Sequence, residues 1–182
     1  MSSDAASSPD PDRLRDIFNR AVAHIERRWN IPVRIQDVPD PFTGDLDGEQ
    51  IMVDHDLEPE NAVFILIHLF GHTVQWNLSE AHRAIGTAVP PLSDAQLAEV
   101  VVYETEAACY SLQLLHDLGI TDLDQWVSDF AACDSAYLVH FYKTGEKLPF
   151  RAFWKAGAPL LDGLPIPEFH PTRWVTRNGT VV

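Results

Sequence analysis

The stretch Ala62–Trp76, AVFILIHLFGHTVQW, is apolar on almost every side when it is drawn as a helix. A helix of that kind lies inside a folded domain, because a helix at the surface needs a polar face. Glu58-Pro59 stands just before it, and proline is favoured at the first helical position. The sequence therefore predicts a buried helix from Glu58 to about Asn77, around which the rest of the domain packs.

Two histidines, His68 and His72, interrupt this apolar run. Side chains four residues apart lie on one face of a helix, one turn from each other. Burying two imidazoles without partners costs roughly a few kcal/mol each, and a shared cation or carboxylate removes that cost. We therefore predict that His68 and His72 bind one divalent metal ion. Zinc is the first candidate, and the spacing leaves iron, nickel and manganese open.

A second long helix supplies a carboxylate. It is predicted to start at Ser93 with the capping-box pattern Ser93-x-x-Gln96 and to end at Leu118, before Gly119. Glu104 falls on the small, apolar face of this helix, where a charged side chain needs a positive partner. We predict that Glu104 is the third metal ligand, with water in the fourth position. A metal-free alternative, in which Glu104 bonds directly to the two histidines, stays open.

The remaining patterns predict a fold that is α+β and mainly helical. The expected elements are a helix over Asp12–Trp29, strands over Val33–Val38 and Glu49–Asp54 in a small antiparallel sheet, a loop over Leu78–Leu92, and a helix over Thr121–Gly145 that breaks near Cys133-Asp134. Residues 1–11 are expected to be a disordered tail, and residues 12–182 a single domain. The proline- and aromatic-rich segment 146–182 is expected to wrap this domain as an irregular strap.

The formal net charge of −14 excludes two classes of partner. An acidic surface repels nucleic-acid phosphates and anionic membranes, so we expect a peptide or a protein as the partner. The oligomeric state stays open. The start of the sequence lacks a basic and apolar leader, and the two cysteines, Cys109 and Cys133, do not make a disulfide framework. We therefore expect a cytoplasmic protein with reduced thiols.

The buried helix carrying His68 and His72, followed by Glu104-x-x-Ala107, resembles the ImmA/IrrE family of zincin metallopeptidases. The resemblance covers about residues 12–118. It implies a zincin-like, minimal metallopeptidase fold in which His68, His72 and Glu104 hold zinc.

One position departs from that family. The catalytic glutamate of the family follows the first histidine and acts as the general base, whereas this chain has Leu69 there. General-base catalysis contributes about 10²–10⁴-fold, so peptidase activity by this route is not expected. A degenerate peptidase, or pseudoenzyme, is the leading hypothesis. Glu106 is the candidate for a replacement catalytic base, and an active metallohydrolase or a non-haem iron enzyme that uses the same triad is an alternative. Another is a metal-free module whose acidic surface binds a protein.

Four further side chains are secondary candidates, and for each a purely structural role is the competing interpretation. Gln75 stands one turn after His72 and is a candidate for bonding a ligand. His140 and Tyr142 are candidates for orienting a metal-bound group, and His170 for capping the cavity.

Overall fold

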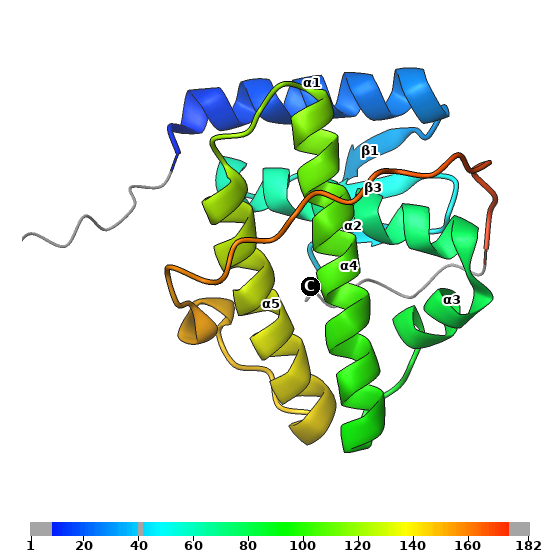
Figure 1. The fold of residues 1–182 in the computed structure, drawn as a ribbon, viewed down its shortest axis with the longest axis vertical. Coiled ribbons are helices and arrows are strands. Elements are labelled where there is room, and N and C mark those ends of the chain that lie inside the picture. The colour runs from blue at the N-terminus through cyan, green and yellow to red at the C-terminus, as the bar shows by residue number, and fades with distance from the viewer. Residues whose placement is uncertain (1–8, 40–41, 175–182) are drawn as a thin grey trace, which may run out of the picture.

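The computed structural model describes residues 9–39 and 42–174 of the 182-residue chain. These residues form an α+β, mainly helical fold (Figure 1). Its elements in chain order are α1 (Pro11–Trp29), β1 (Val33–Gln36), β2 (Gly44–Leu46), β3 (Ile51–Asp54), α2 (Pro59–Leu78), α3 (Glu80–Gly86), α4 (Asp94–Asp117), α5 (Asp124–Thr144) and the 3₁₀ turn η1 (Phe150–Phe153).

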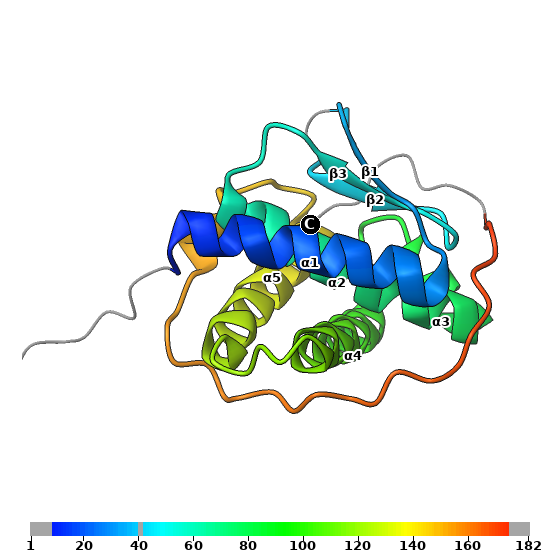
Figure 2. The same cartoon turned by 90° about the horizontal axis from the view of Figure 1, so that it is seen from above.

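Helix α2 lies at the centre, as its composition predicts. Every residue from Val63 to Trp76 is buried. Seen from above, the sheet covers one side of α2 and helices α4 and α5 cover the other, with α1 crossing over it (Figure 2). The core cluster accordingly joins side chains of α1, the sheet, α2, α4 and α5, so that α2 is shielded all round.

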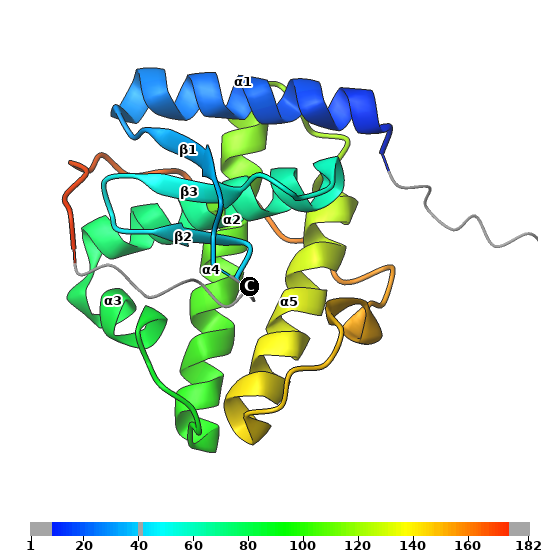
Figure 3. The same cartoon turned by 180° about the vertical axis from the view of Figure 1, so that it is seen from behind.

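The sheet has three strands in the order β1-β3-β2 (Figure 3). Strand β3 pairs in parallel with β1 and antiparallel with β2. The prediction of an antiparallel sheet was therefore wrong, because the sheet is mixed. Between the two predicted strands the structure has a further strand, β2, which forms a hairpin with β3 and leaves β1 on the opposite edge of the sheet. Gly44 lets β2 approach α2, since an added Cβ would lie 2.7 Å from Leu69 Cδ1.

Two helical predictions need correction. The segment predicted as the loop Leu78–Leu92 contains α3, whose N-cap Ser79 accepts a hydrogen bond from the backbone N–H of His82. Helix α5 continues through Cys133-Asp134, where a break was predicted. Both of these residues are buried, so they belong to the packing face and do not mark an end of the helix.

Of the expected strap, the structure describes residues 146–174, which contain the turn η1 and are otherwise irregular. After η1 the chain is irregular, and it lies along the outer side of α4 and α5 (Figures 1 and 2). Phe169 stacks on Trp29 with ring centroids 6.3 Å apart, and the N–H of Leu164 donates to the carbonyl of Cys109 at 3.1 Å. Residues 175–182 of the strap and 1–8 of the predicted tail lie outside the described residues, and Pro11 already belongs to α1.

No helix within residues 9–39 and 42–174 combines the length and the hydropathy needed to cross a membrane.

The closest approach of two helices places the candidate site. Gly71 of α2 faces the backbone of α4, and an added Cβ would overlap the carbonyl group of Ala107. One turn further along, Ser111 Oγ donates to the carbonyl of Ile67 at 2.9 Å and so ties α4 to α2. The missing side chain at Gly71 therefore lets α4 lie directly against the face of α2 that carries the two histidines.

Replacing Gly71 with alanine should push α2 and α4 apart, because the obstacle is backbone and cannot rotate away. We expect Gly71→Ala to lower the free energy of unfolding by about 1–3 kcal/mol, the usual range for overpacking a core. Urea unfolding followed by circular dichroism measures this. An unchanged midpoint and slope would contradict the close contact of the two helices.

Candidate metal centre

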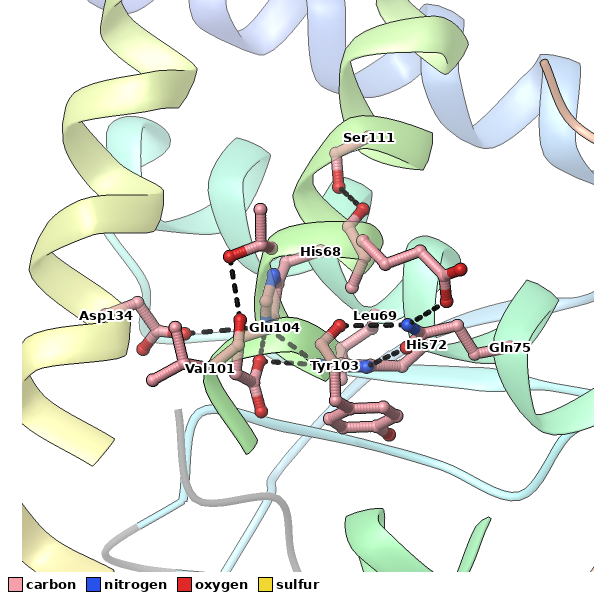
Figure 4. Close-up of polar contacts among 12 residues, drawn as sticks. His68, Leu69, His72, Gln75, Val101, Tyr103, Glu104, Ser111 and Asp134 are labelled. Carbon is pink, nitrogen blue, oxygen red and sulfur yellow. Dashed lines mark hydrogen bonds and ion pairs between the residues drawn. The ribbon is translucent and has the colours of Figure 1, made fainter. Parts of the chain in front are cut away.

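Three side-chain atoms from α2 and α4 converge on one point (Figure 4). His72 Nε2 lies 2.9 Å from His68 Nε2 and 3.0 Å from Glu104 Oε2. His68 Nε2 lies 3.1 Å from the same oxygen. The three residues predicted from the sequence thus form one compact group that could hold a metal ion, and all three are buried.

The amide of Gln75 sets the protonation of His72. Gln75 Nε2 donates to the carbonyl of Tyr103 at 2.9 Å and to Glu106 Oε2 at 2.6 Å. Both partners are acceptors, which fixes the amide with its oxygen toward His72, where Gln75 Oε1 lies 2.8 Å from Nδ1. His72 Nδ1 must therefore carry a proton, and in a neutral imidazole the lone pair is then on Nε2, which points into the site.

Hydrogen bonds alone cannot satisfy this group. A ring nitrogen carries either a proton or a lone pair, and an ionised carboxylate is an acceptor alone. If one histidine donates, the other histidine and Glu104 face each other as two acceptors. If both donate to Glu104, the two histidines face each other as two donors. At most two of the three contacts among His68, His72 and Glu104 can be hydrogen bonds, whereas a cation bonds all three atoms at once.

The spacing of the three atoms suits a small cation. A tetrahedral zinc ion with bonds of about 2.0 Å separates its ligand atoms by about 3.3 Å. The observed separations of 2.9–3.1 Å need an outward shift of a few tenths of an ångström. Two neutral imidazoles and a carboxylate are also donors that zinc prefers.

Burial makes the group costly without a positive charge. The exposed fraction is 1% for His68, 2% for His72 and 7% for Glu104. Burial by itself raises the pKa of Glu104, but the charges and hydrogen bonds of His72 and His68 outweigh it and hold that pKa well below its usual range. Glu104 is therefore ionised whenever a histidine beside it is charged, and a metal ion can take over that positive charge.

Aromatic rings hold the two imidazoles in place. Phe64 stacks on His68 with centroids 5.2 Å apart, and Tyr103 stacks on His72 at 4.4 Å. The hydroxyl of Tyr103 accepts a hydrogen bond from Trp76 Nε1 at 2.9 Å, which anchors the ring. His68 Nδ1 is buried and has no hydrogen-bond partner among the described residues, so no hydrogen bond at that nitrogen helps to orient the ring.

Sequence reasoning missed one acidic residue at this centre. Asp134 of α5 is 1% exposed, and its Oδ2 lies 3.5 Å from His68 Nε2 (Figure 4). Burial raises the pKa of Asp134 to about 7, although His68 lowers it and Glu104 adds a smaller rise. A signal was present in the sequence: Asp134 is four residues from both Phe130 and Leu138, so it shares their buried face of α5.

Glu106 lies one layer away from the three converging atoms. Its Oε2 accepts the bond from Gln75, and it is 3.6 Å from His82 Nε2. Glu106 therefore reaches His72 through Gln75, and its catalytic role stays a prediction. Gln75 itself bonds a histidine of the site.

The other secondary candidates lie away from the group. His140 is near Glu146 at 3.9 Å, Tyr142 packs in a separate apolar cluster, and His170 is exposed on the strap.

A second group of metal-binding residue types occurs within the described part of the chain, at Asp37, Asp54 and His55. Two of its members are exposed, and the carboxylate of Asp54 already accepts the backbone N–H groups of Val38 and Asp56, each at 2.8 Å. Solvent and backbone N–H groups satisfy the polar atoms of this group. Unlike the buried group, it therefore does not require a metal ion.

Comparison of the chain with protein-family models, with curated proteins and with solved structures found no match.

The thiol of Cys133, the residue before Asp134 in α5, should be unreactive. Burial, with a smaller contribution from Asp134, raises the pKa of Cys133 to about 11. At pH 8 about one thiol in a thousand is then ionised, and thiolate is the form that reacts. We expect the folded protein to show slow alkylation of Cys133 by iodoacetamide at pH 8, with Cys109, which is half-buried, reacting first. Mass spectrometry of labelled peptides reads both sites, and equally fast labelling of Cys133 would contradict its burial.

Proposed function

We propose that this chain binds one divalent metal ion, zinc in the first place, through His68, His72 and Glu104 on a metallopeptidase-like scaffold. The supporting observation is that the three atoms lie 2.9–3.1 Å from each other although hydrogen bonds can satisfy at most two of the three contacts. Because the group is inside the core, it is shielded from bulk water, which therefore does not satisfy the third contact. A cation removes the conflict for all three atoms.

The second layer supports the same proposal. Metal-binding histidines usually donate their other ring N–H to an oxygen acceptor, which fixes the tautomer and the ring orientation. His72 has that arrangement with Gln75, and Gln75 is in turn held by Glu106 and by the carbonyl of Tyr103. The chain therefore holds His72 with its metal-binding nitrogen turned toward His68 and Glu104.

The same centre is poorly arranged for peptide hydrolysis. Leu69, at the position of the usual general base, has an exposed fraction of 0% and packs beside Gly44 of β2. A carboxylate there would be buried in hydrocarbon. Residues of the described part line pockets of about 250, 310 and 360 Å³, and none of the three pockets is lined by His68, His72 or Glu104. We therefore propose a degenerate peptidase that retains its metal for stability or binding.

Two alternatives use the same residues. A non-haem iron enzyme also has two histidines and one carboxylate, and metal identity separates it from the zinc protein. In the metal-free alternative, Glu104 forms hydrogen bonds directly to the histidines. One of the three contacts then joins two acceptors or two donors and is not a hydrogen bond. The unmet contact favours the metal over this alternative.

Metal content tests the proposal. Purified protein, dialysed against metal-free buffer, should carry about one zinc ion per chain by plasma mass spectrometry. His72→Ala should reduce this to near zero, because two ligands bind zinc far more weakly than three. Removal of the metal with a chelator should lower the melting temperature of the wild type, since a ligand bound to the folded state stabilises it.

His140→Ala is the matched control, because His140 is also on a long helix but lies outside the group. It should keep its zinc. The absence of any metal in wild type and control alike would favour the metal-free alternative, and iron in place of zinc would favour the non-haem iron enzyme. Zinc-loaded wild type should leave casein and short peptides uncleaved; cleavage that a chelator abolishes would show that another base replaces the glutamate.

A further inference from the structure

Neither carboxylate oxygen of Asp134 has a hydrogen-bond partner within the described part of the chain, and the nearest nitrogen that could carry a charge, His68 Nε2, is 3.5 Å from Oδ2. Both oxygens are buried. The side chain is 1% exposed, so bulk water does not serve it. Buried carboxylates in folded proteins are bonded or paired with a cation, because a bare one loses its hydration without compensation. The side chains around Asp134 therefore leave its buried carboxylate without a hydrogen bond.

The position of Asp134 indicates which positively charged group its carboxylate faces. Helix α5 presents it from the side opposite Gln75, and it points at the group that α2 and α4 form (Figure 4). Its Oδ2 is 3.5 Å from His68 Nε2, close to the spacing of ligand atoms around one ion. The nearest candidate for a positive charge is the ion that His68, His72 and Glu104 are proposed to hold.

The charge balance of the centre leads to the same partner. Two neutral imidazoles and the carboxylate of Glu104 bring one negative charge to a divalent ion, so one positive charge stays uncompensated inside the core. Leaving a net charge in a site without bulk water is unfavourable. One further carboxylate brings the centre to neutrality.

We infer that Asp134 is the second carboxylate of the metal centre, facing the fourth position of the ion and balancing its second positive charge. This inference rests on the proposed function. It changes the expected donor set from two histidines and one carboxylate to two histidines and two carboxylates, and it makes α5 a third helix that the metal ties into the core.

A structural role for Asp134 gives different results. If the residue only filled space, or donated a proton to His68, then an amide of the same shape would serve equally well with and without metal. If it balances the ion, the same amide should weaken metal binding while relieving the metal-free protein of an unpaired acid. The two interpretations therefore differ in the effect of the amide on zinc affinity, which falls only if Asp134 balances the ion.

The experiment compares Asp134→Asn with wild type in two measurements. Titration of the chelator-stripped proteins with zinc, against a competing chromophoric chelator, should show one site in each and an affinity at least about tenfold weaker in the variant. Thermal unfolding without metal should show a melting temperature equal to or higher than that of the wild type. Asp134→Leu, of similar size, gives the same two expectations if the amide does not fold.

Asp129→Asn is the matched control. Asp129 is also a buried residue of α5, but its Oδ1 accepts hydrogen bonds from Gln125 Nε2 and from the backbone N–H of Ala158. It should lose stability without metal and keep its zinc affinity within about threefold.

An unchanged zinc affinity in Asp134→Asn would overturn the inference and leave the proposed function standing. A variant that loses stability equally with and without metal would do the same. A wild-type protein that binds no zinc would instead refute the proposed function itself.

Discussion

The close contact between α2 and α4 at Gly71 is the constraint on which the rest of the structure depends. Because residue 71 has no side chain, the backbone of α4 at Ala107 lies against α2. Glu104, one turn earlier on α4, then reaches His68 and His72, which occupy the same face of α2 as the glycine. A larger residue at position 71 would separate the carboxylate from the imidazoles.

The contact between α2 and α4 places polar side chains inside the hydrophobic core. Glu104 and both histidines sit in the core with Asp134 beside them, and hydrogen bonds within the described part of the chain leave several of their atoms unsatisfied. A protein core tolerates such a group when a cation holds it together. Under the proposed function a bound metal ion gives the fold part of its stability, and the burial of His68, His72 and Glu104 limits the access of peptides to it.

The sequence predicted the α+β, mainly helical class and the convergence of His68, His72 and Glu104, because helical spacing and an apolar setting are local properties of the chain. The sequence did not predict β2, because this strand depends on pairing with β3. Its short, glycine-containing segment has by itself the composition of a turn. Asp134 was misinterpreted for a related reason. An aspartate following a cysteine was taken as the end of a helical segment, although its spacing from Phe130 and Leu138 places it on the buried face.

X-ray absorption spectroscopy of the metal-loaded protein tests the central claim most directly, since it reports the atoms bound to the ion. The account predicts a nitrogen and oxygen shell at about 2.0 Å with the outer-shell scattering of two imidazoles. A hydrated ion without imidazole scattering, or with a single imidazole, would contradict it.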